Sequence, residues 1–314
     1  MSKARVVADG PLGQTVLELF ADRIEVLPWS VTSEGSSAPI DAVYTYGHPH
    51  LNGEMLDRLP GVKVISNYGV GVDHIDVGDA AERGIPVGNT PGILDGATAD
   101  MGFTLLLAAA RRLVEGDRYA RSSEFTTYDP GYMLGREVHG ATIGIVGMGR
   151  IGEQIAKRAR GFDMRVLYHN RNRKEAAEAS LAATYVSFDQ LLRESDYVML
   201  TVPLTNETRG MIGVEEFGRM KPTAILINIA RGPVVDMDAL TTTLQSRQIY
   251  GAGLDVTDPE PLPRDHPLLT LDNVTIAPHL GSATEQTRQK MAEISVENLF
   301  RGLRSEALLH QVEL

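Results

Sequence analysis

Cysteine and an excess of positive charge are both missing from this sequence. The absence of cysteine from all 314 residues excludes disulfide bonds, a thiolate nucleophile and cysteine-ligated metal centres. The 41 acidic residues outnumber 30 lysines and arginines, and the formal net charge of −11 repels phosphate backbones and anionic membranes. The most apolar run, residues 101–110, is half a membrane span, and the first residues lack the apolar stretch of a signal peptide. We therefore expect a cytoplasmic protein without nucleic-acid or membrane partners.

The sequence does contain two series of short β-type runs that alternate with helical stretches. Its 43% hydrophobic and 23% charged residues are typical of a globular chain of two domains. The alternation predicts parallel βαβ units, and near-continuous Val, Ile and Leu in the second series predict strands buried on both faces. The expected strands are 4–9, 23–28, 42–47, 62–69 and 85–89 in the first series, and 141–147, 165–170, 197–203, 224–230, 249–256 and 274–279 in the second.

The segments around these series indicate how the domains are divided. Residues 96–115 are strong helix formers with near-continuous apolar character, so we expect one long buried helix there, followed by a loop over 122–135. The amphipathic segment 285–303 is long enough to return to the first domain. We expect an α/β fold of two doubly wound domains, a smaller flavodoxin-like domain from 1–95 and 287–314 and a Rossmann domain from 96–286.

A glycine-rich segment follows the first strand of the second series. Gly147-Met148-Gly149-Arg150-Ile151-Gly152 stands between a β-type run and a helical stretch, which is the context that a dinucleotide-binding fingerprint requires. Gly147 would make the tight turn, Gly149 would let the backbone approach the pyrophosphate, and Gly152 would let helix and strand pack closely. N–H groups at the positive helix end would bind the phosphates. The alternative is a glycine-rich turn without a ligand.

The end of the next strand indicates which nicotinamide cofactor is bound. A free ribose 2′-hydroxyl is usually met by Asp or Glu at this position, but here the strand ends in the neutral Asn170. The following Arg171 and Arg173 could hold a 2′-phosphate through charge-assisted, bidentate hydrogen bonds. We therefore expect NADPH to be preferred over NADH. The alternative is that the run 171–174 is only a solvated loop.

Three later segments each present a polar group at or just beyond a buried strand. Arg231, Glu260 and His279 are associated with the expected strands 224–230, 249–256 and 274–279. Ligands of open α/β sheets bind at the carboxyl ends of strands, so the three groups predict an anion site beside an acid/base group. Taken singly, each of the three is more often a surface ion-pair member or a satisfied core group.

Ordered motifs along nearly the whole chain resemble the D-isomer-specific 2-hydroxyacid dehydrogenase family. Besides the fingerprint they are VGNTPG at 87–92, VPLT at 202–205, ETRG at 207–210, NIARGPVVD at 228–236, GLDVTDPEPLP at 253–263 and NVTIAPHLGSAT at 273–284. Within the family, the segments 66–76 and 97–112 and the neutral Asn170 are most similar to the glyoxylate/hydroxypyruvate/2-ketogluconate reductases.

The resemblance implies a role for each member of the trio. His279 would be the general acid that protonates the substrate carbonyl oxygen as hydride arrives. Glu260 would bind the far ring nitrogen, fix the tautomer and stabilise the protonated ring. Arg231 would bridge the substrate carboxylate and the carbonyl oxygen, whose developing negative charge it would stabilise.

The resemblance also implies where the rest of the substrate and the cofactor bind. Backbone N–H groups of Gly69, Val70 and Gly71 would complete the carboxylate site, and domain closure would exclude water. His48 and Tyr132 would border the substrate pocket. His48 and His50 lack a third ligand, so we expect no metal. The implied cofactor contacts are Thr98, Gly147, Gly149, Arg150, Ile151, Gly152, Val202, Pro203, Thr208, Ile229, Ala230, Asp255, His279 and Gly281, although Asp255 could merely cap a strand end and Thr98 its helix.

These roles lead to one functional prediction and two alternatives. We expect NADPH-dependent reduction of a small 2-keto acid (glyoxylate, hydroxypyruvate or 2-ketogluconate) to the D-2-hydroxy acid, by a homodimer as the resemblance implies. A phosphoglycerate-type dehydrogenase is the first alternative, although it would carry an acidic residue in place of Asn170. The second is a dinucleotide-sensing binding protein of the same fold, which would oxidise no NADPH with any keto acid.

Overall fold

The computed structural model describes residues 3–47 and 49–313, and these form two compact units. The first unit contains the described residues up to 94 together with those from 284 onward, and the second contains residues 95–283. Each unit has its own parallel sheet and its own core. Within the part of the chain that is described, no helix has the length and apolarity needed to cross a membrane.

The first unit is built on a sheet whose described strands follow the order β2-β1-β3-β4-β5. All neighbours are parallel, and this order is that of a flavodoxin-like sheet, as expected. Each strand lies within a run that the sequence predicts. The strands are β1 (Ala4–Ala8), β2 (Ile24–Leu27), β3 (Ala42–Thr45), β4 (Val64–Asn67) and β5 (Val87–Gly88).

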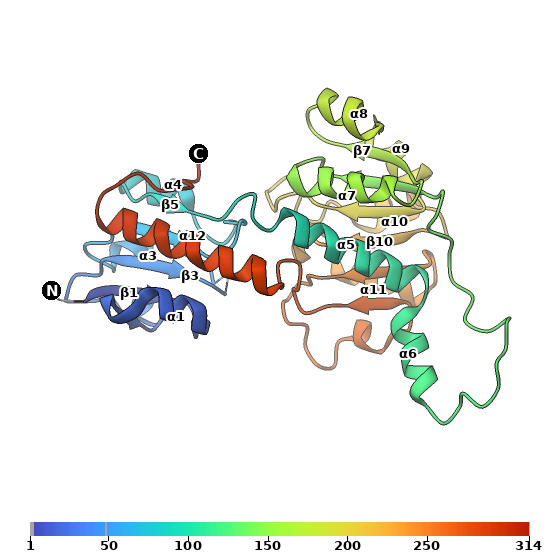
Figure 1. Cartoon of the computed structure of the whole chain (residues 1–314), viewed down its shortest axis with the longest axis horizontal. Coiled ribbons are helices and arrows are strands. Elements are labelled where there is room, and N and C mark those ends of the chain that lie inside the picture. Colours follow the sequence, from blue (N-terminus) through green and yellow to red (C-terminus); the bar gives the residue numbers. More distant parts are fainter. Residues whose placement is uncertain (1–2, 48, 314) are drawn as a thin grey trace. The chain divides into compact units, whose positions relative to one another are not determined.

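The C-terminal helix α12 (Glu285–Leu303) belongs to this first sheet, although it is far from it in sequence. It packs on β3, β4, β5 and α1 (Figure 1), and Tyr44 of β3 shares a buried 2.7 Å hydrogen bond with Ser295 of the helix. Gly302 lies so close to Val64 that a Cβ there would overlap the valine side chain. The other helices of the unit are α1 (Gln14–Phe20), η1 (Ala21–Arg23), α2 (Val31–Glu34), α3 (Gly53–Asp57) and α4 (Val77–Glu82).

The second unit is built on a parallel sheet with the order β12-β11-β10-β9-β6-β7-β8 among the described residues. The order reverses between β6 and β9, and this switch point is where doubly wound sheets bind nucleotides, so the Rossmann prediction is confirmed. The strands are β6 (Thr142–Val146), β7 (Arg165–His169), β8 (Ala183–Tyr185), β9 (Tyr197–Leu200), β10 (Ile225–Asn228), β11 (Gly251–Leu254) and β12 (Val274–Ile276). The sequence predicts six of them and not the edge strand β8.

Alternate residues of the central strands face two separate apolar clusters. In β9, Tyr197 and Met199 join the cluster beneath α5 and α7, whereas Val198 and Leu200 join the cluster beneath α9, α10 and α11. Helices therefore cover both faces of the sheet (Figure 1). The helices of this unit are α5 (Asp95–Ala110), α6 (Leu113–Arg121), α7 (Arg150–Arg160), α8 (Glu175–Leu181), α9 (Phe188–Glu194), α10 (Val214–Arg219) and α11 (Met237–Gln245), with η2 (Gly232–Val234) and η3 (Pro267–Thr270).

The prediction of one helix over 96–115 is wrong, because the structure has α5 and α6 with a break between them. Arg112 at the break adopts a left-handed conformation with φ of 52°. The returning loop causes the break: the N–H of Arg136 donates to the Ala110 carbonyl at 2.8 Å, and Gly135 passes against the same carbonyl. This tertiary cap uses an acceptor that a continuous helix would need.

Candidate active site

The first catalytic candidate, Arg231, is held in an extended conformation just beyond β10. Asn228 ends this strand with no exposed surface, and its side chain donates to the Arg231 carbonyl at 3.0 Å while accepting from the Ala230 N–H at 3.0 Å. The next residue, Gly232, is pressed against the Thr257 carbonyl, where a Cβ would overlap. The arginine turn is therefore fixed against the segment that leads to Glu260.

The other two candidates form a hydrogen-bonded pair. Nδ1 of His279 lies 2.7 Å from Oε1 of Glu260, and the two side chains are 32% and 40% exposed. Because an ionised carboxylate only accepts, the imidazole Nδ1 carries the donated proton. Nε2 is then the ring atom positioned to transfer a proton. The pair is open enough to meet a substrate and is still held in one orientation.

The loop that carries His279 is tied down by Asp255. The two carboxylate oxygens accept from the N–H groups of Leu280 and Gly281, each at 2.7 Å, and the N–H of His279 donates to the Asp255 carbonyl at 2.9 Å. His279 has a φ of 56°, a conformation that few residues other than glycine adopt. Burial raises the pKa of Asp255, and the two N–H donors oppose that rise. Asp255 thus positions the histidine loop.

Strand order explains why the trio assembles. β10, β11 and β12 are neighbours in register, with Asn228 beside Leu254 and Leu254 beside Ile276. Arg231, Glu260 and His279 each follow one of these strands, so all three lie at the carboxyl edge of one sheet. A cavity of about 530 Å³ opens beside Glu260 and His279. The arrangement can hold an anion next to a proton donor.

The fingerprint lies at the switch point and leaves backbone N–H groups accessible. Gly147 has a φ of 107°, and a Cβ there would lie 2.9 Å from atoms of Thr201 and Val202. Gly152 contacts the Gly147 carbonyl so closely that a Cβ would overlap it. Gly149 caps α7 without a side-chain hydrogen bond, and apart from its chain neighbours no described residue has an atom within 4 Å of where its Cβ would be. This open helix N-terminus fits a dinucleotide pyrophosphate.

The polar residues that follow β7 differ in their hydrogen-bond partners. Oδ1 of Asn170 accepts from the Met148 N–H at 2.6 Å, so this side chain holds the fingerprint loop. Arg171 is exposed, whereas Arg173 donates to Glu178 at 2.7 and 2.6 Å. The strand therefore ends without a carboxylate, as the sequence indicates, but the two arginines differ in their partners.

The remaining expected cofactor contacts lie at the same sheet edge or on α5. Val202 and Pro203 follow β9, and the Thr208 hydroxyl donates to the Pro203 carbonyl at 2.6 Å. Thr98, in the first turns of α5, is buried with its Cγ2 3.3 Å from where a Cβ of Gly281 would be. The others stand beyond β10 or in the first turn of α7: Ile229, Ala230, Arg150 and Ile151.

The expected carboxylate turn belongs to the first unit, where it follows β4. The Asn67 side chain donates to the carbonyls of Gly69 and Gly71 at 2.9 and 2.8 Å, and Asn89 donates to that of Val70 at 2.9 Å. In a trans peptide the next N–H points opposite to the carbonyl. The asparagines thus orient the N–H groups of the turn away from themselves.

The sequence predicts two further residues, Tyr132 and His48, at the border of the substrate pocket. Tyr132 lies in the loop after α6, half exposed, with its ring 4.8 Å from that of Tyr119. His48 lies outside the described residues.

Sequence reasoning missed two residues that hold the site together. Asn228 is signalled by a polar side chain at the end of an apolar run. Glu178 has no such signal, because its bond to Arg173 joins residues of a loop and a helix at an irregular spacing.

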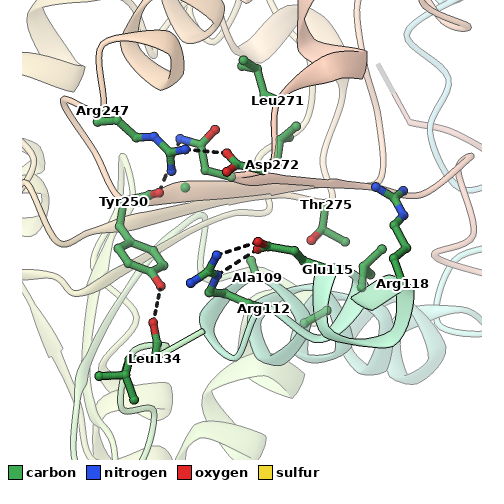
Figure 2. A pocket seen from close by; sticks show the side chains of 15 residues that line it. Ala109, Arg112, Glu115, Arg118, Leu134, Arg247, Tyr250, Leu271, Asp272 and Thr275 are labelled. Carbon is green, nitrogen blue, oxygen red and sulfur yellow. Dashed lines mark hydrogen bonds and ion pairs between the residues drawn. The ribbon is translucent and has the colours of Figure 1, made fainter. Parts of the chain in front are cut away.

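A second cavity of the same unit, about 250 Å³, is lined by the amino ends of β11 and β12 and by α6. Four of the charged side chains there form two ion pairs, Arg112 with Glu115 at 2.6 Å and Arg247 with Asp272 at 2.5 Å. Arg118 stands apart from both pairs (Figure 2). Ligands of such sheets bind at the opposite, carboxyl edge. This cavity is therefore separate from the catalytic candidates.

Comparison with known proteins gives a family match. Residues 103–281 match the model of the D-isomer specific 2-hydroxyacid dehydrogenase NAD binding domain. A glyoxylate reductase of Korarchaeum cryptofilum is 50% identical over 312 residues, covering 97% of this chain and 94% of that protein. A glyoxylate reductase of Pyrococcus furiosus is 49% identical over 315 residues, with coverage of 97% and 94%.

Solved structures agree with this match. An NADPH-dependent glyoxylate/hydroxypyruvate reductase from Sinorhizobium meliloti, in complex with NADP and malonate, has a TM-score of 0.90 at 31% identity, covering 99% of this chain and 97% of that one. A protein from Thermus thermophilus has a TM-score of 0.89 at 43% identity, covering 98% and 100%. The chain therefore belongs to the D-isomer-specific 2-hydroxyacid dehydrogenase family and is an NAD(P)-dependent oxidoreductase that reduces a 2-keto acid.

Proposed function

We propose that the protein reduces glyoxylate, hydroxypyruvate or 2-ketogluconate to the D-2-hydroxy acid with NADPH. The observation that carries this proposal is the 2.7 Å pair of His279 and Glu260, which follow β12 and β11 at the same sheet edge where Arg231 follows β10. Similarity to glyoxylate reductases and to an NADPH-dependent glyoxylate/hydroxypyruvate reductase supports the substrate class and the cofactor.

Arg231 binds the substrate. Its planar fork pairs with the carboxylate and the neighbouring carbonyl oxygen, a geometry that a lysine ammonium lacks. As negative charge develops on the carbonyl oxygen, the guanidinium stabilises it.

His279 supplies the proton. Nε2 donates to the carbonyl oxygen, and the negative charge of Glu260 on Nδ1 stabilises the protonated ring and fixes its orientation. When bound, the reduced nicotinamide supplies the hydride that the carbonyl carbon accepts. Asp255 keeps the histidine loop in place through its hydrogen bonds to Leu280 and Gly281.

Residues at the carboxyl edge of the second sheet would hold the cofactor. The N–H groups at the start of α7 would bind its pyrophosphate, and Arg171, with Arg173 as a weaker second partner, would bind its 2′-phosphate. Asp255 and Thr98 would hold its nicotinamide end. The other proposed contacts are Gly147, Gly149, Arg150, Ile151, Gly152, Asn170, Val202, Pro203, Thr208, Ile229, Ala230, His279 and Gly281.

The proposed homodimer forms through the second unit. Large apolar side chains on α6 and the loop after it are exposed: Leu113 by 62%, Tyr128 by 78% and Leu134 by 69%. This loop runs out from the body of its unit before returning to β6 (Figure 1). Burial of these side chains against a second copy favours association, and Tyr132 would then lie near the partner subunit. We assign the reaction to the cytoplasm, where NADPH is kept reduced.

Initial rates test the proposal. Oxidation of NADPH and of NADH is followed with glyoxylate, hydroxypyruvate, 2-ketogluconate and pyruvate. We expect the highest kcat/KM with NADPH and one of the first three acids. Pyruvate with NADH as the best pair, or no turnover with any acid, would contradict the proposal. For the cofactor site, Arg171→Ala should weaken NADPH binding and leave NADH binding unchanged.

A further inference from the structure

The segment that joins β7 to α8 carries two arginines in unequal surroundings. Nε and Nη2 of Arg173 donate to Oε1 and Oε2 of Glu178 at 2.7 and 2.6 Å. Two parallel bonds between a guanidinium and a carboxylate form the strongest kind of ion pair in proteins. The charge of Arg173 is thus compensated before any ligand arrives.

Glu178 is in turn fixed by the core of the sheet. The hydroxyl of Tyr168, a fully buried residue of β7, donates to Oε1 of Glu178 at 2.7 Å and accepts from the Lys174 N–H at 2.8 Å. The Glu178 side chain is 16% exposed, compared with 59% for Arg173. Hydrogen bonds from Arg173 and then Tyr168 lower the pKa of Glu178 to about 2. The carboxylate therefore stays ionised and stays in place.

Arg171 has no such partner. It is exposed and has neither a hydrogen bond nor an ion pair with any residue that the structure describes, although its charge acts on the exposed Glu207. Of the two arginines near the end of β7, Arg173 is therefore balanced internally and Arg171 is available to an incoming anion. Lys174, the third cation of this segment, is also exposed.

We propose that Glu178 is a positioning residue for cofactor selection, which holds Arg173 and neutralises it, so that recognition of the 2′-phosphate depends mainly on Arg171. This inference rests on the proposed cofactor site. A carboxylate bound to Arg173 also repels a phosphate dianion that approaches the same guanidinium. The enzyme consequently prefers NADPH over NADH less strongly than it would if both arginines were uncompensated, and it accepts both cofactors.

Glu178→Gln tests the proposal, because the amide keeps an oxygen for Tyr168 and Arg173 but removes the charge. Dissociation constants for NADPH and NADH are measured by nucleotide fluorescence at fixed ionic strength. We expect the NADPH Kd to fall about five-fold and the NADH Kd to change less than about two-fold, since only NADPH carries the extra phosphate. The gain should shrink at high salt, which a purely structural change would not cause.

Two matched variants separate Glu178 from the general charge of its helix. Glu175→Gln removes an exposed carboxylate from the same helix that has no hydrogen bond to Arg173, and we expect a smaller gain for NADPH. Arg173→Ala alone should change the NADPH Kd less than about two-fold, whereas in the Glu178→Gln background it should cancel the gain. This non-additive effect of the two substitutions is the result expected if Glu178 holds and neutralises Arg173.

Three results would overturn the inference: no tightening of NADPH in Glu178→Gln, an equal gain in Glu175→Gln, or a large loss in Arg173→Ala alone. If one of these occurs while Arg171→Ala still weakens NADPH binding, the proposed role of Glu178 is wrong and the proposed 2′-phosphate site remains. If Arg171→Ala also has no effect, the 2′-phosphate site itself is wrong. The Arg173→Ala result decides the question even if Glu178→Gln does not fold.

Discussion

At the residue scale, the proposed proton donor His279 is hydrogen-bonded to a carboxylate through the ring nitrogen opposite the one that would transfer the proton. The 2.7 Å bond from Glu260 fixes Nδ1 of His279 and leaves Nε2 as the atom for transfer. The carboxylate also stabilises the charged ring electrostatically. Orientation and charge are two separate contributions, and a substitution that keeps the shape of Glu260 can separate them.

Glu260→Gln should lower kcat/KM for glyoxylate about ten-fold or more. The amide keeps the shape of the side chain but removes the negative charge that stabilises the protonated ring. Initial rates with glyoxylate measure the effect. Asp258→Asn, which neutralises an exposed carboxylate two residues earlier, should leave kcat/KM unchanged; an unchanged kcat/KM in Glu260→Gln would refute the charge contribution.

The contact between Gly232 and Thr257 offers a second residue-scale prediction. A Cβ at residue 232 would overlap the Thr257 carbonyl, so Gly232→Ala must displace either the Arg231 turn or the segment toward Glu260. We expect a loss of about 1–3 kcal/mol of unfolding free energy and a lower kcat/KM. Chemical denaturation measures the loss of unfolding free energy. The control is Gly116→Ala in α6, where no described residue outside the helix backbone has an atom within 4 Å of the added Cβ. This variant should be neutral or slightly stabilising, and similar stability of the two variants would contradict the prediction.

At the element scale, α8 is attached to β7 by the bonds of Glu178 to Tyr168 and Arg173. The pKa of this carboxyl is lowered from 4.5 to about 2, so its contribution to stability is present above the unfolded value and is lost as the pH falls through that window. We expect wild type to melt above Glu178→Gln at neutral pH. The difference in Tm should disappear as the pH falls toward 2. A difference that stays constant with pH would argue against this linkage.

The close contact between α7 and the fingerprint leads to another element-scale prediction. A Cβ at residue 152 would overlap the Gly147 carbonyl, so Gly152→Ala should push α7 away and displace the N–H groups proposed to bind the pyrophosphate. We expect the Kd for both NADPH and NADH to rise about ten-fold or more, a cost of about 1.4 kcal/mol. Equilibrium binding experiments measure the Kd of each cofactor. Unchanged binding of both cofactors would show that this contact does not position the phosphate site.

The elements also show how far the sequence could predict the fold. The central strands were predictable because their apolar runs are continuous, whereas β8 is a three-residue edge strand without a clear pattern. The break between α5 and α6 was not predictable, because its cause is a bond from Arg136, which is distant in sequence. Motifs predicted Arg231, Glu260 and His279 as the catalytic candidates, but the hydrogen bonds of Asn228 and Glu178 depend on tertiary distances that sequence spacing does not contain.

At the scale of the whole molecule, the proposed homodimer interface consists of the exposed apolar side chains of α6 and its loop. A charge introduced there would be costly to bury in a dimer interface and costs nothing in a monomer. Leu113→Glu combined with Tyr128→Glu should therefore shift the protein from dimer to monomer in sedimentation velocity experiments while α/β content is retained. A wild-type monomer, or a variant that remains dimeric, would contradict the proposed interface.

The proposal as a whole requires His279 to be the proton donor, and one variant tests this directly. His279→Asn removes the imidazole but keeps a residue that tolerates the left-handed backbone at this position. We expect kcat for glyoxylate reduction to fall about 10²-fold to 10⁴-fold, with the NADPH Kd changed less than about two-fold. A variant that binds NADPH normally and retains more than about a tenth of wild-type kcat would contradict the account.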